Sequence, residues 1–493
     1  MNYREYNPEQ IQLFGYKPED VLSEDHLVYL VDEMIENLNL KNFYELTPRA
    51  GNPAYDPRIM LKVLFLGYAT GIFSSRKLQQ HCQENLAFIH LTRGQRPKFR
   101  AICEFRVNHQ EHIKELFPQM LEIAKKLNIL RLGRLILDST KIKANASGNR
   151  VIRADKYDEK LKSIDDYLQN AHLQDAEEDK IYGKELTGQE LPQELHSKSK
   201  RLEKLKEVIQ QAKDQNLKYI NTTDPEAKYI KDSDINKIKP SYNVQTGMDK
   251  DSGLIVAYKT TDTPTDNEHL EDMIKRAKEN VGITPKEVDA DSGYYSNASI
   301  AQLEKEHIDT CIPDSNTVSF LRKANSAMTN GTDNKKYTQD DFRYDVADDS
   351  YICPQNKVLS FSAEAKAGRN KNRLKTVRRY LCREMCNTCS DARRCLASIK
   401  VKHRMLEIDP NRNALILTQE KFKTEEYQQR YKARGAFIER VYGHFKKNLR
   451  FTQFHLRGKT KADVEVTLLC MGFNLLALKH WLIVKALGSL AAI

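Results

Sequence analysis

The stretch LRLGRLILDSTKIKANAS, residues 130–147, places a carboxylate directly after a short apolar run. The run 135–137 (Leu-Ile-Leu) is typical of a buried strand, and the strand is predicted to end at Asp138. An aspartate at this position can simply cap the next turn with its side chain. It can also lie at the carboxyl edge of an α/β sheet, where ligands bind. The rest of the chain decides between these two interpretations.

The composition favours a globular protein with a polyanionic partner. The chain has 493 residues, 40% of them hydrophobic, which is enough for several domains with apolar cores. Lys and Arg number 79 against 68 Asp and Glu, and the formal net charge is +11. The run 371–383 (KNRLKTVRRYLCR) holds six cations and no acid. Such runs often form ordinary solvated faces, but the overall excess favours nucleic acid as the partner.

No targeting segment is predicted. The N-terminus MNYREYNPEQ lacks the basic and apolar regions of a secretory signal. The apolar stretches 59–73 and 466–487 are interrupted by polar residues, so no membrane span is expected. Nine cysteines without an export signal indicate a reducing compartment. We therefore expect a cytoplasmic protein.

The N-terminal part of the chain, residues 1–130, is predicted to be helical. Asp56 followed by Pro57 is an N-cap and first-turn pattern, and Gly71 is a helix terminator. Two further helices, near residues 75–88 and 97–109, flank a basic turn. They could form a DNA-reading pair or be part of a helical bundle, and the pattern does not separate these alternatives.

A charged helical insertion is predicted at about 150–220. After it, the pattern of apolar residues changes from helical to strand-like. The segment 241–261 predicts a hairpin, residues 267–278 predict a helix, and a short strand at 287–290 is followed by Asp291. A right-handed crossover through the helix would make the strands before Asp138 and Asp291 parallel neighbours. Two carboxylates at one edge repel each other unless a cation is bound between them.

A third carboxylate is expected because hard divalent cations take several oxygen ligands. The best candidate is Glu439, in the predicted helix YQQRYKARGAFIERVYGHFKKNLRF. Lys446 follows Glu439 by seven residues and would share its helix face. Lys446 and Lys447 would then lie where a phosphate backbone approaches the metal site.

Three ordered blocks resemble the DDE transposases of bacterial insertion sequences. They are LDSTKIKANAS with Asp138, ADSGYYS with Asp291, and IERVYGHFKKNLRF with Glu439. The N-terminal helices also look like the N-terminal domain of that family. The resemblance implies an α/β fold with a ribonuclease H-like catalytic core, a mixed sheet flanked by helices. It places the domains at 1–130 (helical, DNA-binding), 131–314 with 411–493 (catalytic), and 315–410 (a basic insertion rich in cysteine).

The resemblance also implies the reaction and its cofactors. The three carboxylates would hold two Mg²⁺ or Mn²⁺ ions for DNA cleavage at the element ends and strand transfer into target DNA. The family's Tyr-Arg-Glu-Lys signature maps onto Tyr431, Arg434, Glu439 and Lys446, although Arg434 lies one residue further from Glu439 than in the best-known form. Lys141, Tyr431, Arg434, Lys446 and Lys447 are predicted to contact DNA.

The implied partners are double-stranded DNA, as terminal inverted repeats and target, and a second copy of the chain in the synaptic complex. The implied location is the bacterial cytoplasm, associated with the nucleoid. Two alternatives remain open from the sequence. The chain could be an inactive transposase-derived DNA-binding protein, or a metal-dependent nuclease that cuts without joining.

A cysteine cluster lies between the second and third blocks. Cys386 and Cys389 have the C-x2-C spacing of a zinc knuckle, and Cys353 with Cys395 could complete four thiolate ligands. Cys382 leaves the choice of ligands ambiguous. Unmetallated thiols in a reducing compartment are the alternative.

Overall fold

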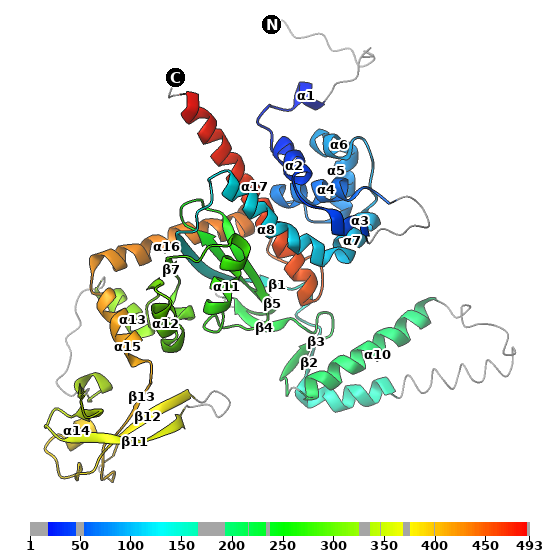
Figure 1. Ribbon diagram of the computed structural model, residues 1–493. Helices are drawn as coiled ribbons and strands as arrows, with labels where there is room; N and C mark the ends of the chain where they lie inside the picture. Colours follow the sequence, from blue (N-terminus) through cyan, green and yellow to red (C-terminus); the bar gives the residue numbers. More distant parts are fainter. Residues whose placement is uncertain are drawn as a thin grey trace, which may run out of the picture. The chain divides into compact units, whose positions relative to one another are not determined.

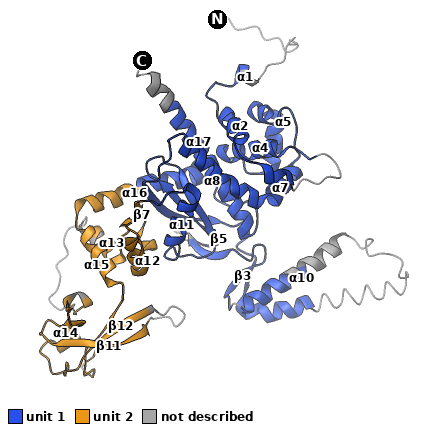
Figure 2. Cartoon of the chain, in the orientation of Figure 1, with its two compact units in different colours: residues 1–285, 436–493 blue, residues 286–435 orange. Residues whose placement is uncertain are grey.

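A computed structural model describes residues 18–45, 54–165, 193–214, 216–232, 237–324, 336–345, 347–367, 375–398 and 400–490. The chain forms two compact units (Figure 1 and Figure 2). Unit 1 comprises Met1–Pro285 with Ala436–Ile493, and unit 2 comprises Lys286–Gly435. Each unit is described by itself below.

Unit 1 begins with eight helices. These are α1 (Pro18–Val21), α2 (Leu27–Glu36), α3 (Lys41–Glu45), α4 (Pro57–Thr70), α5 (Ser75–Glu84), α6 (Leu86–Thr92), α7 (Phe99–Asn108) and α8 (Gln110–Lys126). Helix α4 confirms the predicted signals at both of its ends. The Arg58 N–H donates to the Asp56 carboxylate at 2.8 Å, and Gly71 ends the helix with a left-handed φ of 81°.

The sheet of unit 1 is built around the strand β5 (Lys237–Asp249). It pairs antiparallel with β1 (Arg134–Lys143), β4 (Lys228–Asp232) and β6 (Ile255–Thr261). The β5–β6 hairpin confirms the predicted one. Helix α11 (Leu270–Val281) packs against β6 and α8, and helix α17 (Lys459–Leu490) packs against β6, α4 and α8. The N-terminal helices and the sheet therefore share one apolar core through α17.

Strand β1 does not end at Asp138 as predicted. It continues to Lys143, in register with β5, so that Asp138 lies opposite Thr246 and Lys143 opposite Ser241. The strand continues because Ile142 and Thr140 remain buried and β5 offers backbone partners along the whole length. Asp138 is consequently in the middle of a paired strand, so its side chain points to one defined face of the sheet.

The charged insertion is a separate arm of unit 1. It contains β2 (Val151–Arg153) paired antiparallel with β3 (Tyr219–Asn221), the 3-10 turn η1 (Ala154–Lys156), a helix at 157–165 and α10 (Gln193–Asp214). A small core holds the arm together: Tyr157, Ile164, Ile209, Ala212 and Ile220. This confirms helices in the predicted insertion, while its residues 166–192 lie outside the described part.

Helix α17 is the one described helix that is long and apolar enough to cross a membrane, over Lys459–Val484. Of its most apolar window, 56% is buried inside the protein. A mostly buried apolar helix is typical of a protein core, and α17 occupies that place in unit 1.

Unit 2 contains a parallel strand pair and an antiparallel sheet. The parallel strands β7 (Glu287–Asp289) and β8 (Asp309–Cys311) are connected through the 3-10 turn η2 (Ser292–Tyr294) and α12 (Asn297–Lys305). The antiparallel sheet has the order β13 (Met405–Ile408), β12 (Lys375–Cys382), β11 (Val358–Ala367), β10 (Ser350–Ile352) and β9 (Arg343–Asp345). The remaining elements are α13 (Ser315–Ala324), η3 (Gln339–Asp341), α14 (Ala392–Cys395), α15 (Arg412–Lys421) and the first part of α16 (Glu425–Gly443).

The mixture of helices with antiparallel and parallel strands is compatible with a DDE catalytic domain. A ribonuclease H-like core remains a prediction, as do the functional domain limits 1–130, 131–314 with 411–493, and 315–410. The two compact units are defined by packing, and their limits differ from the predicted domain limits. Unit 1 contains the N-terminal helices together with β1, β4–β6 and α17.

Candidate functional site

Asp138 lies on the same face of the unit 1 sheet as its cross-strand partner Thr246. Its neighbours on that face by strand alternation are Thr140 and Ile142, both buried. The Ser139 N–H donates to the Asp138 carboxylate at 2.8 Å. Asp138 itself is half-buried, so its charge is only partly screened by solvent.

Tyr442, in the last turn of α16, fixes that helix over Asp138. Its hydroxyl lies 2.6 Å from the Thr246 hydroxyl, and Thr246 is the direct cross-strand partner of Asp138. Burial raises the pKa of Tyr442 well above its ordinary value, and the negative charge of Asp138 raises it further. The end of α16 therefore packs at the Asp138–Thr246 pair.

Glu439 precedes Tyr442 by three residues and is one helical turn away on α16. Ile438 and Val441 are fully buried and hold this part of the helix against the core. Glu439 is exposed. The structure thus brings Asp138 and the Glu439 turn of α16 to the same region of unit 1.

The prediction that Glu439 and Lys446 share one helix face is wrong. The α-helix ends at Gly443 and continues as a π-helical turn, His444–Asn448. A π turn holds more residues per turn than an α turn, so Lys446 is rotated away from the direction of Glu439. Phe445 stays fully buried in this turn, while Lys447 is exposed.

Lys141 lies on the opposite face of β1 from Asp138, because strand side chains alternate. Its ammonium donates to the Ser139 hydroxyl at 3.1 Å and lies 3.7 Å from the Asp266 carboxylate. Asp266 also accepts hydrogen bonds from the side chains of Asn243 and Gln245. Lys141 is therefore held by a carboxylate on the α11 side of the sheet, and its predicted contact with DNA remains untested.

Asp291 belongs to unit 2 and follows β7 by two residues. Its carboxylate accepts a hydrogen bond from the Gly293 N–H at 2.9 Å and caps the turn η2. One oxygen of Asp291 therefore caps a turn, which is the alternative role that the sequence allows for an aspartate after a strand. A carboxylate has further lone pairs, so the cap leaves acceptor capacity for another ligand.

Arg430 anchors the end of β7 and was not predicted. This buried side chain on α16 donates from Nε to Asp289 at 2.8 Å and pairs with Asp309 at the start of β8. Burial would lower the pKa of Arg430, but hydrogen bonds and charge from Asp289 and Asp309 raise it instead. The contact joins residues 141 positions apart, which no local pattern indicates.

Tyr431 and Arg434, the two signature residues before Glu439, contact each other in unit 2. The Arg434 guanidinium lies 5.4 Å from the centre of the Tyr431 ring. Tyr431 also packs edge-to-face on Phe422 at 5.8 Å. Tyr431 and Arg434 therefore stack as an i, i+3 pair on α16.

Asn474 ties α17 to the sheet in the heart of unit 1. Its amide accepts from the Ile255 N–H and donates to the Ile255 carbonyl, both at 2.8 Å. This fully buried residue is therefore a structural clamp between α17 and β6.

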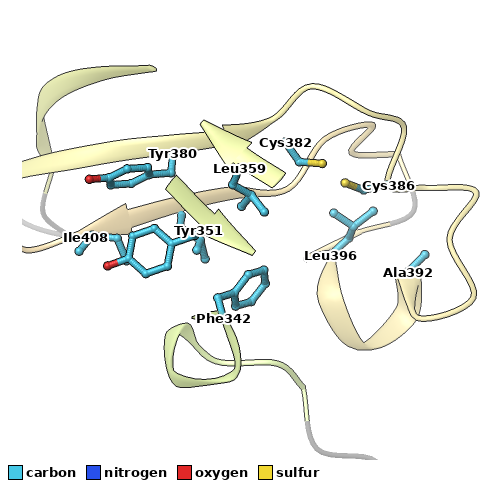
Figure 3. Close-up of a cluster of buried hydrophobic side chains, with 10 residues drawn as sticks. Phe342, Tyr351, Leu359, Tyr380, Cys382, Cys386, Ala392, Leu396 and Ile408 are labelled. Atoms are coloured by element: carbon cyan, nitrogen blue, oxygen red, sulfur yellow. The ribbon is translucent and has the colours of Figure 1, made fainter. Parts of the chain in front are cut away.

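The cysteine residues of unit 2 gather around one small pocket. Cys353, Cys382, Cys386, Cys389 and Cys395 all line it, together with Arg404. Figure 3 shows Cys382 and Cys386 beside the apolar core of this sheet. The Lys357 N–H donates to the Cys353 sulfur at 3.2 Å and the Arg404 N–H to the Cys386 sulfur at 3.3 Å. Both sulfur atoms therefore lie next to backbone N–H groups.

The surroundings of Cys395 and Cys382 bear on which of the five thiols could bind a metal ion. Burial raises the pKa of Cys395, and the nearby thiols Cys386, Cys353 and Cys389 raise it further. Cys382 is buried in β12, and its pKa is raised to about 11 by burial and by its hydrogen bond with Cys386. Cys395 therefore lies near the other three predicted ligands, while Cys382 and Cys386 both belong to the buried core.

Among the residues that the structure describes, no group of three or more side chains is closed around a common metal position. The donor types nevertheless fit the predicted ions. Carboxylate oxygens suit Mg²⁺ or Mn²⁺, and four thiolates suit Zn²⁺.

Two family models match the chain. A transposase DDE domain matches residues 352–479, which include Glu439 and the four predicted thiolate ligands. A transposase domain matches residues 17–108. No curated protein and no solved structure matches the chain. Asp138 and Asp291 lie outside both matched ranges, and their roles stay predictions. Both matched domains are transposase domains, and together they support a DDE transposase of an insertion sequence.

Proposed function

We propose that this transposase carries out metal-dependent DNA cleavage at the ends of its element and transfers the freed strands into target DNA. The observation that carries the proposal is the contact between Tyr442 and Thr246, which docks the Glu439 helix beside Asp138. A strand carboxylate and a helix carboxylate from distant parts of the chain are thereby brought to one region. Asp291 is the third member of the proposed set.

Asp138, Asp291 and Glu439 would hold the divalent cations. When bound, two such ions activate the attacking oxygen and stabilise the leaving 3′ oxygen. Asp138 would hold a cation from a half-buried position on a paired strand, whereas Glu439 would do so from an exposed position on α16. No covalent protein intermediate is needed, so no serine or tyrosine is assigned as a nucleophile.

Tyr431, Arg434, Lys446, Lys447 and Lys141 are proposed as contacts to the DNA backbone. Lys447 is the best placed of these by its exposure, whereas Lys141 is held by Asp266. Phosphate contacts give affinity that falls steeply with salt and carry little sequence information. The proposed partners are the terminal inverted repeats and target DNA, bound by two copies of the chain in the bacterial cytoplasm.

The cysteine pocket is proposed to hold one structural Zn²⁺ through Cys353, Cys386, Cys389 and Cys395. The two backbone N–H groups that point at Cys353 and Cys386 sulfur support this proposal. The ion would link the turn after β10, the segment between β12 and β13, and helix α14.

The test of the catalytic proposal is excision in cells. A reporter gene is interrupted by a marker flanked with the DNA found on either side of this gene. We expect the native chain to restore the reporter, and Asp138→Asn, Asp291→Asn and Glu439→Gln each to reduce restoration on the order of 10³-fold or more. Glu279→Gln, an exposed carboxylate on α11, serves as the control and should leave excision unchanged.

Two outcomes would favour the alternatives. Specific end binding without excision by any variant would favour an inactive DNA-binding protein. Cleaved ends without joined product, measured on purified DNA, would favour a nuclease.

A further inference from the structure

A pocket of about 540 Å³ lies beside α16 and the C-terminal half of α17 in unit 1. Phe437 and Arg440 line it from one face of α16, and Glu439 points to a different side of that helix. The β5–β6 turn, residues 250–253, forms another wall. None of the residues proposed for cleavage lines this pocket.

The walls of the pocket are aromatic. Phe437, Phe473 and Trp481 all line it. The indole N–H of Trp481 donates to the Ser252 carbonyl at 2.8 Å, which fixes the orientation of the ring. His444 packs edge-to-face on Phe473 at 5.6 Å. Flat, fixed rings around one space are suited to stacking on a planar ligand.

Two cations border the same space. The Lys250 ammonium lies 6.0 Å from the centre of the Phe437 ring, with the exposed Asp251 beside it at 3.7 Å. Arg440 is exposed, and no carboxylate in the described part of the chain pairs with it. A planar ligand that also carries negative charge would match this combination.

His444 lines the pocket beside Phe473. The side-chain nitrogen of Asn448 lies 3.3 Å from His444 Nδ1. Nε2 is buried and has no hydrogen-bond partner among the described residues. Burial lowers the pKa of His444, which keeps the ring neutral at physiological pH.

We propose that this pocket binds one unpaired nucleotide of a DNA strand. The base would stack among Phe437, Phe473 and Trp481, and the phosphate of the nucleotide would lie at Lys250 and Arg440. Aromatic stacking with cations on the backbone is the general way in which proteins hold unpaired bases. The proposal rests on the proposed function, since it takes DNA as the ligand. An apolar side chain from a second copy of the chain fits less well, because it would leave the cations Lys250 and Arg440 without an anionic ligand.

Trp481 is the single tryptophan of the chain, so its fluorescence reports on this pocket alone. The experiment titrates the full-length protein with a short single-stranded oligonucleotide and with the same oligonucleotide made entirely abasic. We expect the first to quench Trp481 emission and the second to leave it unchanged. Phe473→Leu and Arg440→Gln should each weaken the quenching titration about tenfold. Lys275→Gln, an exposed cation on α11, is the control for the loss of charge and should have no effect.

Three results would overturn the proposal. The first is unchanged emission at oligonucleotide concentrations where anisotropy of a labelled strand shows binding. The second is equal quenching by the abasic strand, which would indicate a phosphate site without a base. The third is emission that changes with protein concentration in the absence of DNA, which would assign the pocket to a second copy.

The test is separable from that of the proposed function. Asp138→Asn should abolish excision and leave the quenching titration intact. If the oligonucleotide does not quench Trp481 emission while the native chain still excises the marker, only the proposal that the pocket binds a nucleotide is wrong.

Discussion

The antiparallel sheets of the two units are stabilised in different ways. In unit 1, α11 packs against β1, β5 and β6, α17 packs against β6, and the residues of the core are largely aliphatic. In unit 2, the five-stranded sheet has a core of ten buried residues, two of which are cysteines. A core that small supplies limited hydrophobic free energy. We therefore expect the second sheet to depend more on polar and sulfur contacts than the first sheet does.

The polar contacts of the unit 2 sheet centre on Asp349. This residue, at a left-handed φ of 45°, accepts hydrogen bonds from Arg378, Tyr380 and Tyr344. Arg378 also stacks on the Phe361 ring at 4.7 Å. A second ion pair joins Arg379 and Glu407 at 2.8 Å across β12 and β13. These contacts stabilise the end of the sheet near the turn between β9 and β10. The cysteine pocket lies at the opposite end of the sheet.

The largest expected effect concerns the metal. Removing a bound zinc with a chelator should disorder the unit 2 sheet, because structural Zn²⁺ contributes about 10 kcal/mol or more to small metal-dependent folds. Hydrogen exchange of β10–β12, measured with and without chelator, checks this, with β1 and β5 as the internal reference that should stay protected. Metal analysis should give one zinc per chain.

Cysteine variants sharpen the same prediction. Cys386→Ser and Cys389→Ser should lose the zinc, while Cys382→Ser and the half-buried Cys103→Ser should retain it. A native protein that is purified without zinc and has a protected unit 2 sheet would contradict the zinc site.

The next largest effect concerns Arg430. Arg430→Met leaves Asp289 buried and without its cation, and breaking a buried ion pair in this way costs about 3–5 kcal/mol. Urea unfolding followed by probes in unit 2 measures the loss. The double variant Arg430→Met/Asp289→Asn removes both charges and should recover part of it. Equal losses in the single and double variants would show that packing of the arginine stem, and not charge, is what matters.

Acid should destabilise unit 2 through Asp309. Burial alone would raise the pKa of Asp309, but hydrogen bonds from Tyr427, Lys421 and Arg430 outweigh it and lower the pKa below its ordinary value. The stabilisation is therefore complete above the unfolded pKa of about 4 and is lost as the pH falls through the lower folded value. Urea midpoints of the native chain and Asp309→Asn, compared between about pH 6 and pH 3, should converge as the pH falls. Parallel curves at all pH values would exclude this carboxylate as the cause.

The sequence predicts the local elements of this chain well. The capped helix at Asp56–Gly71, the β5–β6 hairpin, α11 and the helix with Glu439 all follow from residue patterns and are confirmed. The extent of β1 beyond Asp138 was mispredicted, because pairing with β5 overrides the polar residues that suggest a turn. The π turn at His444–Asn448 leaves no clear mark in the sequence, since its residues also suit an α-helix.

The contacts that position the candidate site are long-range and were missed for that reason. Tyr442 with Thr246 and Arg430 with Asp289 join residues 196 and 141 positions apart. Each of these residues is ordinary in its local context. Only the folded chain shows that α16 is fastened to β5 through one and to β7 through the other.

The smallest expected effect is the most informative about α16. Tyr442→Phe keeps the ring in the core and removes the hydrogen bond to Thr246, which costs about 1 kcal/mol of stability. Thr246→Val should cost a similar amount, and the double variant should cost little more than either one, because both remove the same contact. Tyr258→Phe, which removes the hydrogen bond to Thr467 between β6 and α17, is the matched control in unit 1. If the hydroxyl of Tyr442 only positions the helix, excision by Tyr442→Phe should fall a few-fold, while Tyr258→Phe leaves excision unchanged. A loss as large as that of Glu439→Gln would instead place the Tyr442 hydroxyl among the groups that act on DNA directly.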